Sequence, residues 1–143
     1  MTIRPLQSAD LGIANDLLQQ LGYDIDRAEL ATRMDRVLSN TTHFAAVVEE
    51  AGAIRGLVHA YERSALEKAY EVVVQSLVVD RNVRNTGLGM QLMTAVETWA
   101  KARGAEQVVL HTRVDRADAR LFYERIGYSI SASSHLMAKP LAR

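Results

Sequence analysis

The stretch Asp80-Arg-Asn-Val-Arg-Asn-Thr-Gly-Leu-Gly-Met-Gln-Leu-Met93 decides how the rest of the chain is interpreted. Its two glycines, Gly87 and Gly89, stand between a β-branched run and an apolar pattern of helical spacing. The first N–H groups of a helix lack intrahelical partners and carry the positive end of the helix dipole. Glycines there keep side chains away from the backbone, so the stretch predicts an anion site at a helix start. Taken alone, a Gly-x-Gly turn before a helix is more often simple turn chemistry.

The composition is that of an ordinary globular chain, and it excludes several classes of function. The 143 residues predict one domain over residues 1–143, and 48% of them are hydrophobic. The 17 basic and 17 acidic side chains cancel, which argues against a nucleic-acid partner. The chain has no cysteine, so disulfides, thiolate metal sites and acyl transfer through a cysteine nucleophile are excluded.

The chain offers no segment that predicts membrane insertion. Its first ten residues lack an apolar signal core, and its longest apolar run, Val72 to Val79, is interrupted by Gln75 and Ser76. We therefore expect no membrane association and a cytoplasmic location. Nothing in the sequence decides the oligomeric state, and a homodimer stays open.

The first half of the chain predicts two helices and a hairpin. A short edge strand at Ile3–Pro5 precedes a helix that starts after Ser8 and ends at Gly22. A second helix follows the capping-box pair Asp26 and Glu29. Two β-rich runs separated by a short loop then predict a hairpin, at His43 to Glu50 and Ile54 to Arg63.

The second half predicts a βαβ unit around the glycine turn. The run Tyr70 to Asp80 should be a central strand, the helix after Gly89 should stop at Gly104, and Val108 to Val114 should be a strand parallel to the first. The turn would then lie at the carboxyl end of a parallel strand. The remaining residues predict a last helix and two terminal strands, at Ala117–Ile126, Tyr128–Ser131 and His135–Lys139.

Two motifs together point to a known family. The pattern Val-Asp-x-x-x-Arg-x-x-Gly-x-Gly, from Val79 to Gly89, resembles the acyl-CoA pyrophosphate loop of the GNAT superfamily of N-acyltransferases. The segment Ala119-Arg-Leu-Phe-Tyr-Glu-Arg-Ile-Gly-Tyr128 is similar to that family's Ala-x-x-x-Tyr-x-x-x-Gly-Phe/Tyr segment. The resemblance spans essentially the whole chain. It implies a mixed α/β fold: a central, mostly antiparallel sheet, splayed at one parallel strand pair and flanked by about four helices.

The resemblance also implies the site residues. The backbone N–H groups of the glycine turn would cradle the CoA pyrophosphate, and the end of the preceding strand would pair with the pantetheine arm. Tyr123 would act as the acid that assists the leaving thiol. The family often has Asn where this chain has Arg116, so Arg116 is left outside the site. The implied cofactor-binding residues are Leu77, Val78, Val79, Arg84, Asn85, Thr86, Gly87, Leu88 and Gly89.

The implied activity is the transfer of acetyl from acetyl-CoA directly to a primary amine of a small molecule or peptide. The alternatives are a catalytically inactive acyl-CoA-binding regulatory module, against which Tyr123 counts, and an interaction domain without a nucleotide ligand. The general base stays open among Glu71, Glu62, His111 and water. The four histidines show no metal spacing, so we expect no metal.

The acceptor pocket of the family is commonly walled by the first two helices and their connection. Tyr23, Asp24 and Asp26 would then lie near a cationic amine. A helix cap at Asp26 and a turn at Asp24 are the better-supported explanation of the two carboxylates, so they are left outside the site.

Overall fold

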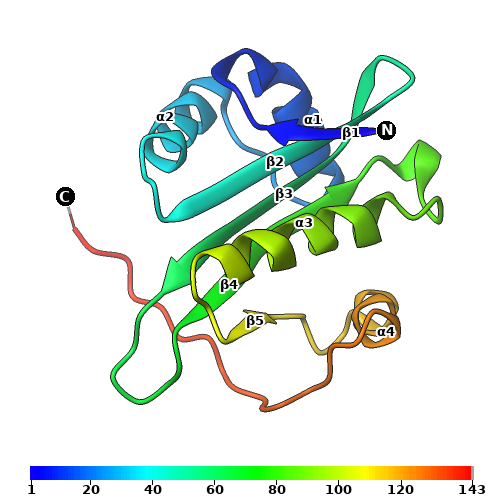
Figure 1. The fold of residues 1–143 in the computed structure, drawn as a ribbon. Helices are drawn as coiled ribbons and strands as arrows, with labels where there is room; N and C mark the ends of the chain where they lie inside the picture. Colours follow the sequence, from blue (N-terminus) through cyan, green and yellow to red (C-terminus); the bar gives the residue numbers. More distant parts are fainter. Residues whose placement is uncertain (143) are drawn as a thin grey trace. The chain divides into compact units, whose positions relative to one another are not determined.

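A computed structural model describes residues 1–142, and the chain divides into two compact units, residues 1–111 and the residues from Thr112 onward. The second unit contains the helix α4 (Ala117–Arg125). The first unit contains all the other elements (Figure 1). In chain order they are β1 (Thr2–Pro5), the 3-10 turn η1 (Ser8–Asp10), α1 (Leu11–Gln20), α2 (Arg27–Leu38), β2 (His43–Glu50), β3 (Ala53–Arg63), β4 (Glu71–Val79), the 3-10 turn η2 (Arg81–Val83), α3 (Leu88–Ala102) and β5 (Gln107–Leu110).

The five strands form one sheet in the order β1-β2-β3-β4-β5. The first three pairings are antiparallel, and β4 pairs with β5 in parallel, with α3 as the connection between them. In Figure 1, α3 lies on one face of the sheet and α1 and α2 lie on the other. The mixed, mostly antiparallel sheet with one parallel pair and four helices confirms the fold expected from the sequence.

The parallel pair opens partway along β4. Pairing with β5 runs only from Glu71 to Val74 of β4. Gln75 is then an extra residue, because Val74 pairs with Ala60 of β3 and the next pair joins Ser76 to the preceding residue of β3. Such a bulge bends the strand that carries it. From Gln75 to Val79, β4 therefore pairs with β3 on one side and with no described strand on the other, which confirms the expected splay.

Apolar side chains pack on both faces of the sheet. On the face of α1 and α2, a cluster joins residues from both helices to β2, β3 and β4: Leu6, Ala14, Leu17, Leu30, Met34, Val47, Leu57 and Val78. On the α3 face, Leu92 comes so close to β3 that a Cβ on Gly56 would lie 3.1 Å from it. Val78, near the end of β4, belongs to the first cluster, so this strand is packed close to where the glycine turn begins.

Two sequence expectations about strands are wrong. The strand expected at Val108–Val114 ends at Leu110, and Val114 is exposed. The terminal strands expected at Tyr128–Ser131 and His135–Lys139 are not formed, since residues 128–142 contain no strand. A strand requires backbone pairing with a neighbour, and β-prone composition alone does not supply it. Ile130, Leu136 and Met137 are accordingly exposed.

Candidate functional site

The turn between β4 and α3 begins with a carboxylate that organises the backbone. Asp80 is the N-cap of η2, and its side chain accepts a hydrogen bond from the Asn82 N–H over 3.2 Å. Arg55 of β3 lies 3.4 Å from the other carboxylate oxygen. The hydrogen bond from the Asn82 N–H is the main reason that the pKa of Asp80 lies below its ordinary value. Asp80 is therefore ionised at neutral pH and fixes the start of the turn.

A second contact ties this turn to α1. The side-chain carbonyl of Gln20, the last residue of α1, accepts a hydrogen bond from the Arg81 N–H over 2.8 Å, and its amide nitrogen donates to Asp80 over 3.4 Å. No local pattern in the sequence indicates Gln20, because the contact joins residues 61 positions apart. The two hydrogen bonds of Gln20 thus hold the end of α1 against the turn before α3.

The glycine turn presents a row of backbone donors. Asn85 has φ 65° and Gly87, the N-cap of α3, has φ 86°, so the chain reverses through two left-handed residues before the helix starts. The Thr86 hydroxyl donates to the Val83 carbonyl over 2.5 Å. Within residues 1–142, the N–H groups of residues 84–90 have no hydrogen-bond acceptor, and the first helical bond is donated by Gln91 to Gly87. No atom comes within 4 Å of a Cβ built on Gly87. The space beside the Gly87 Cα is therefore open.

The expected cofactor-binding residues differ in whether their side chains are buried or exposed. Val78 and Leu88 bury their side chains, which leaves only their backbone groups available to a ligand. Arg84 is exposed, and its Nε donates to the carbonyl of Val79 over 3.3 Å. Only Asp80 and the η2 turn separate the strand end Leu77–Val79, at the open edge of β4, from the turn Arg84–Gly89 at the head of α3.

Tyr123 lies in the second unit, on α4. Its ring packs edge-on against Phe122 and Tyr128, at centroid distances of 5.1 and 6.0 Å. Burial raises the pKa of Tyr123 to about 12, although the nearby charge of Arg116 lowers it slightly. The phenol is therefore protonated at neutral pH. Arg116 is the N-cap residue of α4, and its Nε lies 3.4 Å from Asp118.

Both carboxylates considered as general bases are held by arginines. Glu71 is 1% exposed and accepts hydrogen bonds from Arg63 and from Gln107, over 2.7 and 2.8 Å. Burial by itself would raise the pKa of Glu71, but these hydrogen bonds outweigh it and the net shift is downward. Glu71 also lies where β4 and β5 are still paired, away from the open edge.

Glu62 lies on β3, opposite Val72, and is likewise engaged. It accepts a hydrogen bond from Arg103 over 2.7 Å and another from the Tyr70 hydroxyl. The hydrogen bond from Arg103 is the largest cause of its lowered pKa. Neither Glu62 nor Glu71 is poised to take a proton at neutral pH.

The remaining residues considered from the sequence are exposed. His111 directly follows β5, and Tyr23 and Asp24 lie in the connection between α1 and α2. Asp26 is the cap of α2, with its carboxylate accepting from the Ala28 and Glu29 N–H groups over 3.1 and 3.3 Å. The capping role expected for Asp26 is therefore confirmed.

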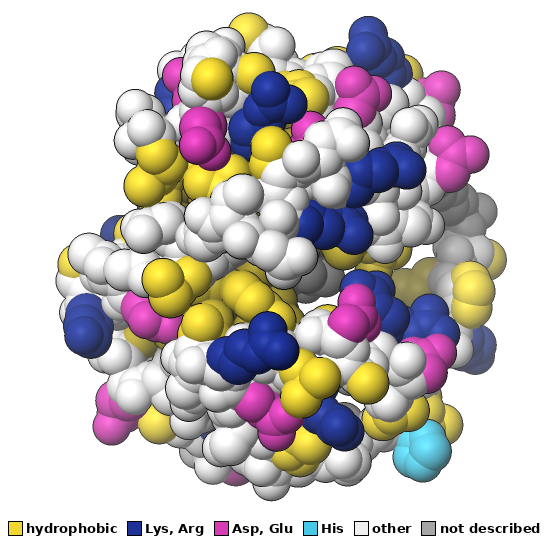
Figure 2. All heavy atoms as spheres, turned by 90° about the vertical axis from the view of Figure 1, so that its right-hand side faces the viewer, with side chains coloured by type: hydrophobic (Ala, Val, Ile, Leu, Met, Phe, Trp, Pro, Cys, Tyr) yellow, Lys and Arg dark blue, Asp and Glu magenta, His cyan; other side chains and the backbone are white. Residues whose placement is uncertain are grey.

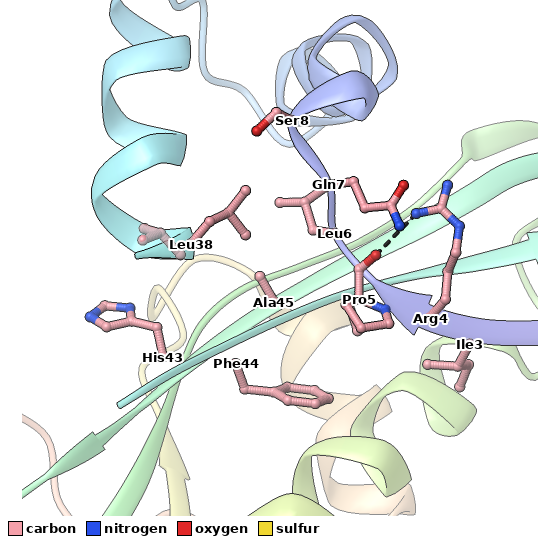
Figure 3. A pocket seen from close by; sticks show the side chains of 12 residues that line it. Ile3, Arg4, Pro5, Leu6, Gln7, Ser8, Leu38, His43, Phe44 and Ala45 are labelled. Atoms are coloured by element: carbon pink, nitrogen blue, oxygen red, sulfur yellow. Dashed lines mark hydrogen bonds between the residues drawn. The ribbon is translucent and has the colours of Figure 1, made fainter. Parts of the chain in front are cut away.

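A pocket of about 600 Å³ opens at the other edge of the sheet (Figure 3). It lies between β1, the start of β2 and the last turn of α2, and its lining includes Arg4, Gln7, Leu38 and His43. In the strand order, β3 and β4 separate β2 from β5, so this pocket is distinct from the open edge of β4.

On the face shown in Figure 2, Lys and Arg side chains lie among Asp and Glu side chains, so neither sign of charge predominates there.

Residues 1–142 contain no group of three or more His, Asp or Glu side chains placed to hold a metal ion. Over the same residues, no helix combines the length and the apolar character needed to cross a membrane.

Comparison with known proteins agrees with this architecture. The model of the acetyltransferase (GNAT) family matches residues 11–128. An N-acetyltransferase of Bacillus subtilis named YhdJ is 26% identical over 126 residues, which is 87% of each chain. An aminoalkylphosphonate N-acetyltransferase of Salmonella typhimurium is 30% identical over 116 residues, covering 80% of this chain and 73% of that protein.

Solved structures share the fold at low sequence identity. The aminoglycoside 6'-N-acetyltransferase AAC(6')-Ig of Acinetobacter haemolyticus superposes with a TM-score of 0.88 at 16% identity, over 99% of this chain and 100% of that one. AAC(6')-Iy, solved with a CoA-linked bisubstrate analogue, has a TM-score of 0.88 at 17% identity, over 98% of each chain. Given the family match over most of its length, the chain belongs to the GNAT family of acetyltransferases.

Proposed function

We propose that the protein transfers acetyl from acetyl-CoA directly to a primary amine, without a covalent enzyme intermediate. The observation that carries this proposal is the row of unpartnered N–H groups over residues 84–90 at the head of α3, next to the open edge of β4. Family membership supports acetyl-CoA as the acyl donor. The absence of cysteine agrees with direct transfer.

In this proposal the backbone supplies most of the cofactor contacts. The N–H groups from Arg84 to Gly89 bind the pyrophosphate, helped by the dipole of α3. The unpaired peptide groups of Leu77–Val79 pair with the amide groups of the pantetheine arm, as an additional strand would. A free N–H of the same edge polarises the thioester carbonyl.

Tyr123 assists the departure of the thiol in this mechanism. With a pKa of about 12, the phenol is a much weaker acid than a thiol of pKa about 8.5. Complete proton transfer to the thiolate would cost roughly 5 kcal/mol, which is the free energy of about 3.5 pK units. Tyr123 therefore donates a hydrogen bond that strengthens as charge develops on sulfur, and it affects rate more than cofactor affinity.

We propose a small-molecule amine as the acceptor, in preference to a peptide amino terminus. The relative named for aminoalkylphosphonate matches 80% of this chain, whereas those named N-alpha-acetyltransferase 80 and N-alpha-acetyltransferase 30 match 50% and 38%. The connection between α1 and α2, with Tyr23 and Asp24, would contact the acceptor. The exposed carboxylate of Asp24 suits a cationic amine.

The test combines binding with turnover. Titration with acetyl-CoA measures the cofactor site, and release of free CoA thiol across a panel of aminoalkylphosphonates, aminoglycosides, polyamines and peptides measures transfer. We expect saturable binding and thiol release with at least one small amine. Binding without release on any acceptor would instead favour an inactive acyl-CoA-binding module, and no binding would contradict both.

A further inference from the structure

The proposed reaction leaves one proton without an acceptor. When the neutral amine attacks the thioester, its nitrogen becomes positively charged and must lose a proton before the amide is formed. Glu71 and Glu62 are already ionised partners of arginines, as described above. These two carboxylates therefore do not take this proton, which leaves His111, water or a group that only the fold brings into place.

Two histidines on neighbouring strands form a direct hydrogen bond. Nδ1 of His43, on β2, lies 2.8 Å from Nε2 of His59, on β3. The ring planes are 18° apart and the centroids are 5.1 Å apart, so the rings meet edge to edge. Because a neutral imidazole has one N–H and one bare nitrogen, one ring donates and the other accepts. Each ring keeps its second nitrogen for another partner.

The pair runs from the region of the bulge to the edge of the sheet. His59 pairs with Ser76, the residue after the bulged Gln75, at the point where β4 loses its parallel partner. His43 begins β2 and lines the pocket at the opposite edge of the sheet (Figure 3). Both side chains are half-buried. One end of the hydrogen-bonded pair therefore lies near the open part of the sheet, and the other end lies at a pocket open to solvent.

Burial decides the protonation state of His59. The Tyr61 ring, on β3, lies 5.6 Å from the His43 ring and 6.5 Å from the His59 ring. Burial, and secondarily His43, lowers the pKa of His59 to about 4. His59 is therefore neutral at pH 7. A ring of such low basicity holds a second proton only briefly, so His59 can take a proton only if it passes its other proton to His43 through their hydrogen bond.

We propose that His59 and His43 form a proton relay that carries the acceptor amine's proton to solvent at the β1–β2 edge. The inference rests on the proposed function. In the competent tautomer, His59 donates its Nε2–H to Nδ1 of His43. The amine N–H bond breaks as the proton moves to Nδ1 of His59, the Nε2 proton of His59 moves to Nδ1 of His43, and the Nε2 proton of His43 moves to water. Exchange with solvent then restores the starting tautomers.

The test compares His59→Gln, His43→Gln and the double variant, with His111→Gln as the rival base. A relay works only as a unit, so each single variant should lower kcat about 10²- to 10⁴-fold, and the double variant should be no slower than the slower single variant. Acetyl-CoA affinity and the urea unfolding midpoint should stay near those of the wild type. Added imidazole should partly restore His43→Ala, because this position adjoins the pocket.

Three results would overturn the relay. They are full activity in either single variant, losses that multiply in the double variant, and a loss confined to His111→Gln. Failure of the proposed function is a separate outcome, because the wild type would then release no CoA thiol with any amine. A wild type that turns over, with histidine variants that do so equally well, rejects the relay alone.

Discussion

Replacing Gly87 with alanine should remove cofactor binding without unfolding the chain. At φ 86° an L-residue costs about 1–2 kcal/mol, while the added Cβ meets no atom within 4 Å. The methyl group would instead occupy the open space beside the turn, where a bound anion would have to lie, and hold that anion away from the free N–H groups. Hydrogen bonds to a charged group contribute about 1.5–3 kcal/mol each, so losing two of them weakens acetyl-CoA binding by at least about a hundredfold. Gly87→Val should abolish binding.

Gly104 supplies a matched control, because it has φ 84° and the same open surroundings but follows the other end of α3. Gly104→Ala should lose a similar 1–2 kcal/mol of stability, or roughly 3–6 °C in Tm, and keep its acetyl-CoA affinity. Calorimetric titration measures affinity, and urea unfolding measures stability. Equal affinities for Gly87→Ala and Gly104→Ala would refute the assignment of the turn as the pyrophosphate site.

Three other predictions concern catalysis, support of the turn and pH. Tyr123→Phe should lower kcat about ten- to ten-thousand-fold with little change in acetyl-CoA affinity, and full activity would remove Tyr123 from the mechanism. Gln20→Ala removes the acceptor of the Arg81 N–H, so it should weaken acetyl-CoA binding several-fold while Tm falls by only a few degrees. An unchanged Kd would show that the turn binds acetyl-CoA without the hydrogen bond from Gln20. The pKa of Glu71 is lowered in the fold, so its stabilising contribution is present above about pH 4.5 and is lost as the pH falls further. The urea midpoint of Glu71→Gln should accordingly change less between pH 7 and pH 4 than that of the wild type, and an equal change would contradict the ion pair with Arg63.

Local patterns predicted the part of the fold that builds the site. The β-branched run before Asp80, the paired glycines and the helical apolar spacing identified β4, the turn and α3, because each depends on neighbours in the sequence. Asp26 was predicted as a cap for the same reason. These elements are specified locally, and the structure has them within a residue or two of the expected bounds.

The sequence did not predict features that depend on distant partners. The bulge at Gln75 exists only relative to the register of β3, and the contact of Gln20 with the turn spans 61 residues. Glu71 was a candidate base until the structure placed Arg63 and Gln107 against it. The hairpin turn between residues 50 and 53 places His43 and His59 on adjacent strands. Counting residues along both strands from this turn would therefore have predicted that the two histidines are neighbours.

The most direct test of the account follows the backbone amides themselves. In an ¹⁵N-labelled protein, addition of acetyl-CoA should shift the amide signals of residues 84–90 strongly downfield, since those N–H groups acquire a charged acceptor. Removing the diphosphate from the ligand should abolish these shifts. Saturable acetyl-CoA binding that leaves the signals of residues 84–90 unchanged would contradict the claim that this turn binds the cofactor.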